Sequence, residues 1–412
     1  MRTSRLSKIL DKWIATYPAF EDVFIPLRGE VIRSKYRKKR EHYTKICEEK
    51  GLVYSEEDTI KRVKRRLNDR GYAPSKHRQG DVHTFAFIPK IGWHEHLYPD
   101  LYELGPVTEF DYIKLGYNNI NVAKPNKEGR ELRKKLNDEW YDALVKSHKE
   151  KPVDWVFVYA SGNHVLAETI RRIQETIGIP VVNMCLDDKQ SWEGLWLGEQ
   201  RGLQIDIAKV FDLSWTSARV AVDWYLAEGG IPLYLPEGVN THVYKPMSGY
   251  RDLDVSFVGA AYGCRPSIIR YLKKYGLSVQ CYGSGWEEGS ISQDLQIEIF
   301  NRSKVNLGIG AIGYAEYLTN LKGRDFEIPG CGGGMYLTSF NPDLALHFDI
   351  GKEMVCYRSR DEMLELIRYY LKHPDEAQLI AKEGRERCLR EHRWKHRYLK
   401  ILKILGIADN CE

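Results

Sequence analysis

Short apolar runs alternate with amphipathic segments along most of the chain after residue 82. Between residues 83 and 237, the apolar runs predict five buried strands, at 83–89, 154–160, 179–186, 208–215 and 231–237. Segments between them, such as 128–149 and 165–176, carry apolar residues at helical spacing. Buried strands that alternate with helices indicate a parallel sheet with helices on both faces. The ligand crevice of such a sheet lies beyond the C-terminal ends of its strands, which selects the loops after Pro89, Tyr159 and Leu186.

A second series of apolar runs predicts strands at 254–259, 278–283, 305–310, 335–340 and 353–357, again with helical segments between them. Residues 238–250, between the two series, are rich in turn-forming residues and indicate a linker. A chain of 412 residues is too long for one ordinary core. We therefore expect an α/β protein with two doubly wound domains, at residues 81–240 and 241–375, followed by C-terminal helices at 376–412.

Residues 1–80 show a different pattern, with helical stripes and no apparent strand. An apolar stripe runs from Leu6 to Ile14, and segments 43–50 and 59–67 look similar. This region holds 21 Lys and Arg against 11 Asp and Glu, a net charge of +10 in a chain whose total is +5. The basic helical extension is therefore a candidate contact for an anionic surface, either nucleic acid or membrane headgroups. A solvated helical face is the alternative.

One stretch, residues 322–338, combines features expected of a ligand site. A short helical run at 324–328 is followed by a Pro-Gly pair and then by three consecutive glycines. Such glycines occur where another backbone or a ligand approaches closely. Three charged residues lie near the helix start, Lys322, Arg324 and Glu327. A helix start already favours an anion. The two cations could bind a phosphate and the carboxylate could bind a diol, a combination that would suit a nucleotide. The alternative is a charged helix start packed by a glycine turn.

This stretch and its surroundings resemble CgeB-like (spore maturation protein) glycosyltransferases, which are relatives of glycosyltransferase family 4 with a GT-B fold. The resemblance rests on RDFEIPGCGGGMYLTSFNPDLALHF from residue 324, DVSFVGAAYGCRPSIIRYLKKYGLSVQCYGSGW from 254, LPEGVNTHVYKP from 235 and IPVVNMCLDD from 179. It covers roughly residues 82–405. It implies two Rossmann-like domains that face a crevice, an acceptor domain followed by a donor domain, with terminal helices that pack back toward the first. It also implies a nucleotide-diphosphate sugar as co-substrate and no cofactor.

The predicted donor contacts lie in the second domain, after strand ends and at the helix start described above. Arg265 begins a helix after a strand, and its guanidinium can donate two hydrogen bonds to a diphosphate. A surface arginine is the alternative. Glu327 matches the second glutamate of the family 4 pair, which binds the ribose hydroxyls. The first would fall at Thr319, which leaves the donor sugar unassigned, and the nearby Glu316 has the wrong spacing. The predicted donor residues are Gly259, Arg265, Gly283, Lys322, Arg324, Glu327, Gly332 and Gly333.

In the first domain, Asp187 and Asp188 follow a predicted strand, at a position where family 4 enzymes carry a histidine facing the donor sugar. Either could orient the acceptor or act as a base in an inverting reaction. A pair that caps a helix near 191–198 is the alternative. The loop at 90–100 also holds residues able to contact an acceptor, Trp93, His94, Glu95 and His96, for which we favour acceptor contact over a metal site. The predicted catalytic residues are Asp187, Asp188, His94 and Arg324, and no metal ligand is predicted.

Three functional hypotheses follow. The preferred one is a metal-independent glycosyltransferase in which Arg265, Lys322 and Arg324 stabilise the leaving diphosphate. The second gives this enzyme a nucleic-acid acceptor, recruited by the basic helices. The third is a GT-B-like binding protein that has lost catalysis, which Thr319 would favour. No apolar run approaches the roughly 18 residues of a membrane helix and no signal-peptide pattern is present, so we expect a cytoplasmic protein.

Overall fold

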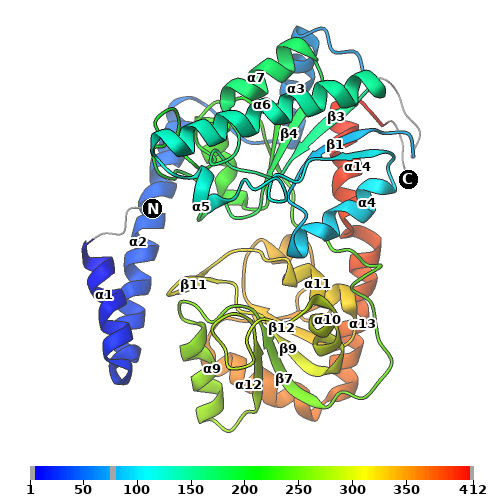
Figure 1. Cartoon of the computed structure of the whole chain (residues 1–412). Coiled ribbons are helices and arrows are strands. Elements are labelled where there is room, and N and C mark those ends of the chain that lie inside the picture. The colour runs from blue at the N-terminus through cyan, green and yellow to red at the C-terminus, as the bar shows by residue number, and fades with distance from the viewer. Residues whose placement is uncertain (1–4, 75–79, 409–412) are drawn as a thin grey trace. The chain divides into compact units, whose positions relative to one another are not determined.

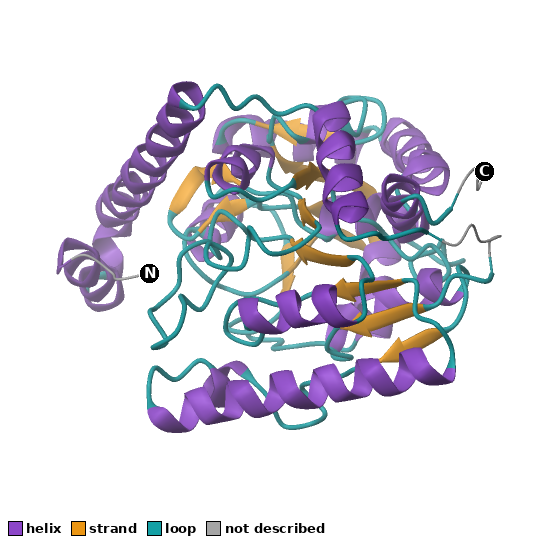
Figure 2. Cartoon of the chain, turned by 90° about the horizontal axis from the view of Figure 1, so that it is seen from above, coloured by secondary structure: helices purple, strands orange, loops and turns teal. Residues whose placement is uncertain are grey.

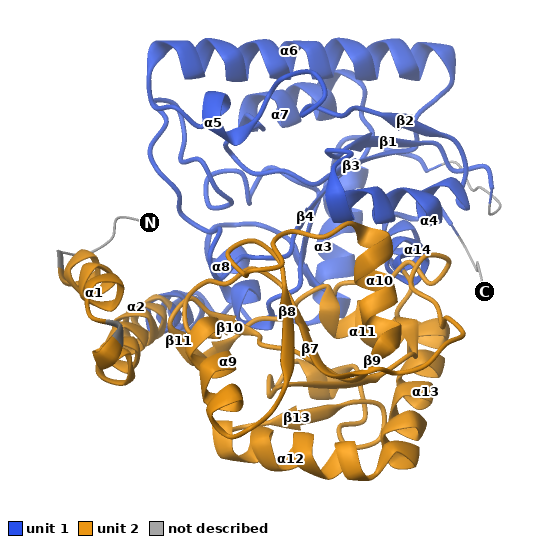
Figure 3. Ribbon diagram, turned by 60° about the horizontal axis from the view of Figure 1, so that its bottom comes forward, with its two compact units in different colours: residues 1, 40–236, 394–412 blue, residues 2–39, 237–393 orange. Residues whose placement is uncertain are grey.

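The computed structural model describes residues 5–74 and 80–408. The chain forms two compact units, which Figure 3 shows in different colours. Unit 1 holds residues 40–236 and the C-terminal segment from Trp394, and unit 2 holds the N-terminal segment up to Lys39 and residues 237–393. The N-terminal helices are therefore shared between the units rather than forming a body of their own. Each unit contains a parallel sheet, so the predicted α/β class with two Rossmann-like sheets is confirmed.

The sheet of unit 1 has six parallel strands in the order β2-β1-β3-β4-β5-β6. They are β1 (Thr84–Phe87), β2 (Val107–Glu109), β3 (Trp155–Val158), β4 (Val181–Cys185), β5 (Leu213–Thr216) and β6 (Pro232–Tyr234). All but β2 fall on the predicted apolar runs, and β5 ends one residue beyond its run. The sequence pattern does not predict β2, because this edge strand is short and partly exposed. The strands run parallel and pair in register, as Phe85 does with Val156, so their C-terminal ends meet at one edge.

Helices cover both faces of this sheet (Figure 2). They are α3 (Glu56–Asp69), α4 (Tyr98–Tyr102), α5 (Asn119–Val122), α6 (Lys127–Glu150), α7 (Ala167–Thr176), α8 (Val222–Ala227) and α14 (Trp394–Leu405), with the 3-10 turns η2 (Gly92–Leu97) and η3 (Arg219–Ala221). Successive strand residues point to opposite faces. Phe85 packs with α6 and α7, which lie side by side in Figure 1, whereas Ala86 packs with α3 and α14. The last helix of the chain is therefore part of the core of unit 1.

The sheet of unit 2 has five parallel strands in the order β13-β12-β9-β7-β8. They are β7 (Leu253–Val258), β8 (Val279–Tyr282), β9 (Ser303–Leu307), β12 (Met335–Ser339) and β13 (Val355–Tyr357). All overlap predicted runs, although β7 begins one residue and β9 two residues before its run. A separate antiparallel pair, β10 (Ala311–Ile312) and β11 (Ala315–Thr319), is not predicted from the sequence, because β10 has two residues and β11 is partly exposed. The helices are α9 (Arg265–Lys274), α10 (Gln293–Arg302), α11 (Arg324–Cys331), α12 (Arg360–Lys372) and α13 (Pro374–Glu391), with the 3-10 turn η4 (Leu344–Leu346).

The chain begins with α1 (Arg5–Thr16), the 3-10 turn η1 (Pro18–Phe20) and α2 (Glu21–Glu49). α2 is one helix of 29 residues, of which the sequence pattern indicates only the last part. Its first part packs on unit 2, where a Cβ on Gly29 would lie 2.6 Å from the carbonyl oxygen of Tyr314. Its last part packs in unit 1, where the hydroxyl of Tyr43 accepts a 2.8 Å hydrogen bond from Nε1 of Trp192.

Two local predictions are wrong. Residues 191–198, expected to hold a helix, are irregular, and an isolated antiparallel bridge joins Trp196 to Arg201. Glycines at 194 and 198 with φ angles of +70° and +106° break any helix there. α11 does not stop at its Pro-Gly pair but continues to Cys331 and ends at a left-handed Gly332. Among the described residues, no helix has both the length and the apolar content that crossing a bilayer requires.

Candidate functional site

The C-terminal edge of the unit 2 sheet is built around two glycines, Gly259 after β7 and Gly283 after β8. Their φ angles are +155° and +126°. A Cβ on Gly283 would lie 2.6 Å from the carbonyl carbon of Gly259, so the two backbones touch. Nε1 of Trp286 donates a 2.7 Å hydrogen bond to the carbonyl oxygen of Gly259 and fixes this contact. The two predicted glycines thus lie side by side at the strand ends, where no side chain of their own fills the space.

Two arginines meet at this edge. A Cβ on Gly259 would lie 3.1 Å from Nη1 of Arg324, which places that guanidinium over the end of β7. Arg265 is only 4% exposed and donates hydrogen bonds to the carbonyl oxygens of Ala260 (3.0 Å) and Ile309 (3.3 Å). Burial, and then the charge of Arg324, lower the pKa of the Arg265 guanidinium. Arg265 therefore links the loops after β7 and β9 and adds positive charge beside Arg324. The sequence analysis instead expects its guanidinium to donate two hydrogen bonds to a diphosphate.

Both guanidinium groups keep unused donors. Nε of Arg324 and Nε of Arg265 are buried without a hydrogen-bond partner among the described residues. Cζ of Arg324 lies 6.0 Å from the centre of the Phe257 ring. Two neighbouring cations repel each other, and an anion placed against them relieves that repulsion. The arrangement is suited to a diphosphate, since guanidinium N–H groups match phosphate oxygens in geometry and charge.

The loop before α11 is fixed by Asp325, for which the sequence pattern gives no signal. Its buried carboxylate accepts a 2.8 Å hydrogen bond from the backbone amide of Lys322 and a 2.6 Å hydrogen bond from the hydroxyl of Tyr336. Burial raises the pKa of Asp325 more than these hydrogen bonds lower it. The amides of residues 325–327 donate to carbonyl oxygens of the preceding turn. The free amides expected at this helix start are therefore already used, and the Arg324 side chain supplies the attraction for an anion.

Glu327 lies on the first turn of α11 beside a second carboxylate, that of Glu237. A Cβ on Gly323 would lie 3.2 Å from a carboxylate oxygen of each glutamate. Burial raises the pKa of Glu327, while the charge of Arg324 and a hydrogen bond from Tyr244 oppose the rise. Two carboxylates that bracket one glycine can accept hydrogen bonds from neighbouring hydroxyl groups. The position of Glu327 is compatible with the predicted ribose contact. Glu237 is a residue that the sequence analysis missed, although it lies in the segment from Leu235 quoted above.

The three consecutive glycines lie at the other end of α11 and pack against neighbouring elements. A Cβ on Gly332 would lie 2.7 Å from the side chain of Arg385, and one on Gly333 would lie 2.5 Å from Cα of Asn301. One on Gly334 would lie 1.9 Å from the carbonyl oxygen of Ser303. The absence of side chains at these glycines lets neighbouring protein atoms pack closely at the N-terminal end of β12. The structure therefore gives no support to Gly332 and Gly333 as ligand contacts, and we leave them out of the candidate site.

Thr319 stands where the first glutamate of the family 4 pair is expected. Its hydroxyl donates a 3.3 Å hydrogen bond to the carbonyl oxygen of Phe340. Its side chain lines a small cavity of about 130 Å³ together with Ser339 and Glu316. Glu316 forms a 2.8 Å ion pair with Arg360. Because its carboxylate already has this partner, Glu316 does not replace the missing glutamate.

In unit 1, His94 lies at the C-terminal edge of the sheet, in the 3-10 turn after β1. Its ring centre is 4.4 Å from that of Trp93 and 5.1 Å from that of Tyr159, the residue after β3. Nδ1 lies 2.7 Å from the carbonyl oxygen of Ile91, so it carries the proton and leaves Nε2 as the basic nitrogen. Burial lowers the pKa of His94, which keeps the ring neutral at pH 7. Two of the three predicted loops thus meet here. His96, in contrast, is buried.

The two aspartates after β4 differ in exposure. Asp187 is half-buried, whereas Asp188 is fully buried. The Asp188 carboxylate accepts a 2.5 Å hydrogen bond from Oγ1 of Thr216 and a 2.8 Å hydrogen bond from the hydroxyl of Tyr225. Burial raises the pKa of Asp188 to about 6. Asp188 holds the end of β4 to β5 and α8, and this geometry argues against the predicted catalytic role. The expected helix cap is also wrong, because no helix follows.

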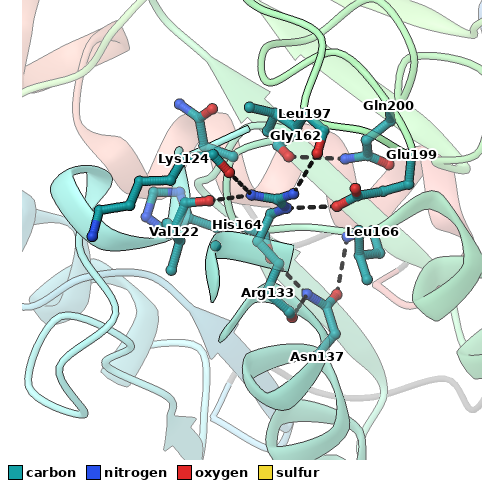
Figure 4. Close-up of polar contacts among 12 residues, drawn as sticks. Val122, Lys124, Arg133, Asn137, Gly162, His164, Leu166, Leu197, Glu199 and Gln200 are labelled. Atoms are coloured by element: carbon teal, nitrogen blue, oxygen red, sulfur yellow. Dashed lines mark hydrogen bonds and ion pairs between the residues drawn. The ribbon is translucent and has the colours of Figure 1, made fainter. Parts of the chain in front are cut away.

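A buried polar network holds the loops at the same edge of unit 1 (Figure 4). Arg133 on α6 forms a 2.6 Å ion pair with Glu199 and donates hydrogen bonds to the carbonyl oxygens of Lys124 (3.0 Å) and Leu197 (2.9 Å). Asn137, one turn along α6, bonds to the loop after β3. The sequence gives no signal for this role, because Arg133 stands in a strongly charged helix. The network fixes the backbone around the candidate acceptor loops.

Comparison with known proteins adds a family match over most of unit 2 and part of the C-terminal segment of unit 1. Residues 265–403 match a family model described as glycosyl transferase-like. The matched region includes Arg265, Arg324 and Glu327. A search of curated protein sequences found no match.

Solved structures resemble the chain over most of its length. Sucrose-phosphate synthase (tll1590) from Thermosynechococcus elongatus has a TM-score of 0.54 at 11% identity, over 80% of this chain and 98% of that chain. The alpha,alpha-trehalose 6-phosphate synthase from Burkholderia multivorans has a TM-score of 0.52 at 11% identity, over 79% and 99%. Anabaena Alr3699/HepE in complex with UDP and glucose has a TM-score of 0.50 at 10% identity, over 79% and 100%. At these identities the likeness shows the fold. The chain therefore has the GT-B glycosyltransferase fold, and its residues 265–403 match a glycosyl transferase-like family model.

Proposed function

We propose that this protein is a glycosyltransferase that moves a sugar from a nucleotide-diphosphate sugar bound by unit 2 to an acceptor bound by unit 1. The observation that carries the proposal is the pair of guanidinium groups at the C-terminal edge of the unit 2 sheet. Arg324 lies over Gly259 with its Nε unpaired, and Arg265 adds a second, buried charge beside it. In a parallel sheet this edge is where ligands bind. The resemblance to CgeB-like and family 4 enzymes supports the same reading.

Each proposed role follows from the chemistry of the residue. Arg324, with Lys322 at the same helix start, binds the diphosphate and stabilises the charge that develops on it as the sugar leaves. Arg265 keeps the loops under Arg324 in place. Glu327 and Glu237 accept hydrogen bonds from the ribose hydroxyls. In unit 1, the neutral ring of His94 accepts the proton of an acceptor hydroxyl at Nε2.

We propose that the transfer is metal-independent. The leaving diphosphate needs positive charge in the transition state, and two guanidinium groups in a partly buried site supply it without an ion. Metal-assisted enzymes instead place carboxylates where they can coordinate a cation beside the phosphates. Here the three atoms nearest to a Cβ built on Gly259 belong to Arg324 and to the ring of Phe257.

The test is thermal unfolding of the full chain with a panel of nucleoside diphosphates and nucleotide sugars. A ligand at about a hundred times its dissociation constant adds ~2.7 kcal/mol to the stability of the state that binds it, so one member of the panel should raise the unfolding midpoint selectively. Arg324→Ala should abolish this rise. Arg302→Ala is the matched control, because Arg302 lies at the opposite edge of the same sheet in an ion pair with Asp252. A panel without any effect, or an Arg324→Ala protein that responds like the parent, would show the proposal to be wrong.

One observation favours a second candidate, a nucleotide-sugar binding protein without catalysis. Thr319 replaces the glutamate that holds the donor sugar in family 4, and Glu316 is engaged with Arg360. The same ligand would then raise the unfolding midpoint, but incubation with the sugar donor would release no nucleoside diphosphate. Detection of that product, with or without an added acceptor, separates the two functions.

A further inference from the structure

The N-terminal helices carry an exposed apolar face that the proposed function does not use. On α1, Leu6, Ile9 and Trp13 follow at helical spacing and are 52%, 36% and 41% exposed. Phe20 at the end of η1, and Val23 and Leu27 at the start of α2, repeat this spacing and are 57%, 54% and 51% exposed. Tyr17, between the helices, is also exposed. We name these seven residues the N-terminal apolar stripe. Side chains of this size exposed together mark an interaction surface more often than scattered ones do.

Only the aromatic members of the stripe help to hold the two helices together, through Phe24 on α2. α1 and the first half of α2 lie side by side (Figure 1), and the ring of Trp13, a member of the stripe, lies 5.3 Å from that of Phe24 on α2. Leu10 and Ile25 are buried at 3% and 4% exposure, and Asp11 forms a 2.7 Å ion pair with Arg28. In turn, Gly29 packs on the backbone of Tyr314 in unit 2. The hairpin is thus anchored mainly through residues outside the stripe, and the stripe residues remain 36% to 57% exposed.

Positive charge flanks the stripe. Lys8 and Lys12 are exposed on α1, and Lys35 and Lys38 are exposed further along α2. On a helix with 3.6 residues per turn, Lys38 continues the line of Leu27, so one face changes from apolar to cationic along α2. The segment 2–39 holds 10 Lys and Arg against 4 Asp and Glu. Three of these acids are neutralised by ion pairs with arginines, at Asp11, Glu21 and Glu30.

We propose that the α1–α2 hairpin docks the protein on the surface of a membrane rich in anionic lipid, with the stripe inserted between the headgroups. Apolar side chains with cations beside them are what an interfacial helix presents to a bilayer. Nucleic acid, the other anionic surface considered, would use the cations but not Leu6, Val23 or Leu27, because phosphates bind cations and bases stack on aromatic rings. The aliphatic members of the stripe therefore decide between the two. This inference is independent of the donor site and of the proposed transfer reaction.

The test is co-sedimentation of the full chain with lipid vesicles. Binding is expected to vesicles with about one-third phosphatidylglycerol in phosphatidylcholine, and not to phosphatidylcholine alone. It should weaken with salt, since the screening length falls from ~10 Å at 0.1 M to ~3 Å at 1 M. Leu27→Glu should lower the partition coefficient at least about tenfold, because it removes a large apolar side chain and adds repulsion. Lys35→Gln combined with Lys38→Gln should lower it by roughly fivefold per charge at low salt.

Leu379→Glu is the matched control, since Leu379 is 57% exposed on α13 of the same unit and outside the stripe. It should bind vesicles like the parent. Circular dichroism checks that the variants keep their helices. Absence of binding to anionic vesicles, or equal binding by Leu27→Glu and Leu379→Glu, would overturn the proposal. Two other results would also overturn it. In the first, the parent does not bind vesicles but is a dimer in light scattering, and Leu27→Glu converts it to a monomer. In the second, the parent binds a duplex oligonucleotide and not vesicles.

Discussion

Asp188 provides a test that separates a structural role from a catalytic one. Its carboxylate is fully buried at the end of β4 and accepts hydrogen bonds from Thr216 and Tyr225. Burial raises its pKa from 3.8 to about 6, more than these hydrogen bonds lower it. The pKa of an aspartate in the unfolded chain stays near ~3.9. The folded state therefore binds this proton more tightly than the unfolded state between about pH 4 and pH 6.

A difference of about two pH units corresponds to about 3 kcal/mol. The stability that protonated Asp188 contributes is fully present below about pH 4 and is lost as the pH rises through about 6, so the ionised carboxylate costs about 3 kcal/mol at neutral pH. Asp188→Asn removes this titration and keeps the shape. The hydroxyl of Thr216 can then donate to the carbonyl oxygen of Ala218, 3.3 Å away, and accept a hydrogen bond from the new amide. The variant should match or exceed the parent in stability at pH 7.

The measurement is denaturant unfolding of parent and variant from about pH 4 to about pH 7, followed by tryptophan fluorescence. Relative to the variant, the parent should lose up to ~1.4 kcal/mol per pH unit within this window. Asp206→Asn is a control of opposite sign. Burial raises the pKa of Asp206, but hydrogen bonds from Arg201 lower it more, so its contribution is lost only below about pH 4, and Asp206→Asn should follow the pH dependence of the parent within this window. Equal pH dependence of parent and Asp188→Asn would refute the reasoning, and a loss of transfer activity at unchanged stability would restore the catalytic assignment.

Three further predictions concern packing and charge. Gly283→Ala should lower the free energy of unfolding by about 2 kcal/mol or more, because its φ is +126° and the new Cβ would lie 2.6 Å from Gly259. Gly276→Ala, with φ +83° and nothing within 4 Å, should cost only about 1 kcal/mol in the same denaturant titration. Arg133→Met should destabilise the protein by about 2 kcal/mol or more in thermal unfolding, since the carbonyl oxygens of Lys124 and Leu197 lose their donor; an unchanged midpoint would contradict the network. EDTA should leave donor binding and transfer unchanged, and recovery of lost activity on adding Mg²⁺ would disprove metal independence.

The fold could be predicted from the sequence where burial is continuous. Strands of a parallel sheet are covered on both faces and therefore appear as unbroken apolar runs, as in β3 and β12. The edge strand β2 has one end in solvent and no such run. The length of α2 could not be predicted, because its middle is rich in charged residues and has few buried ones. A helix that is polar on most sides lacks the stripe on which the prediction depends.

The candidate site could be predicted only in part, because its residues come together from distant segments. Arg324 and Glu327 are recognisable from their place at a helix start. Glu237, however, precedes them by more than eighty residues in sequence, and only the fold brings its carboxylate beside Gly323. Asp187 and Asp188 are equivalent in the sequence. In the structure, the end of β4 and the loop after it place the Asp188 side chain in the core. Only the tertiary structure distinguishes the buried Asp188 from Asp187.

The glycines show which local signal was informative. A run of three is conspicuous, yet Gly332 to Gly334 precede β12 and their neighbours are protein atoms. The isolated Gly259 and Gly283 follow strands, and the space above Gly259 is occupied by the end of Arg324. All strands of the unit 2 sheet are parallel, so every loop that follows a strand opens at one edge and every loop that precedes a strand lies at the other. A glycine after a strand is therefore the stronger indication of a ligand site, because its position in the chain already assigns it to the edge where ligands bind.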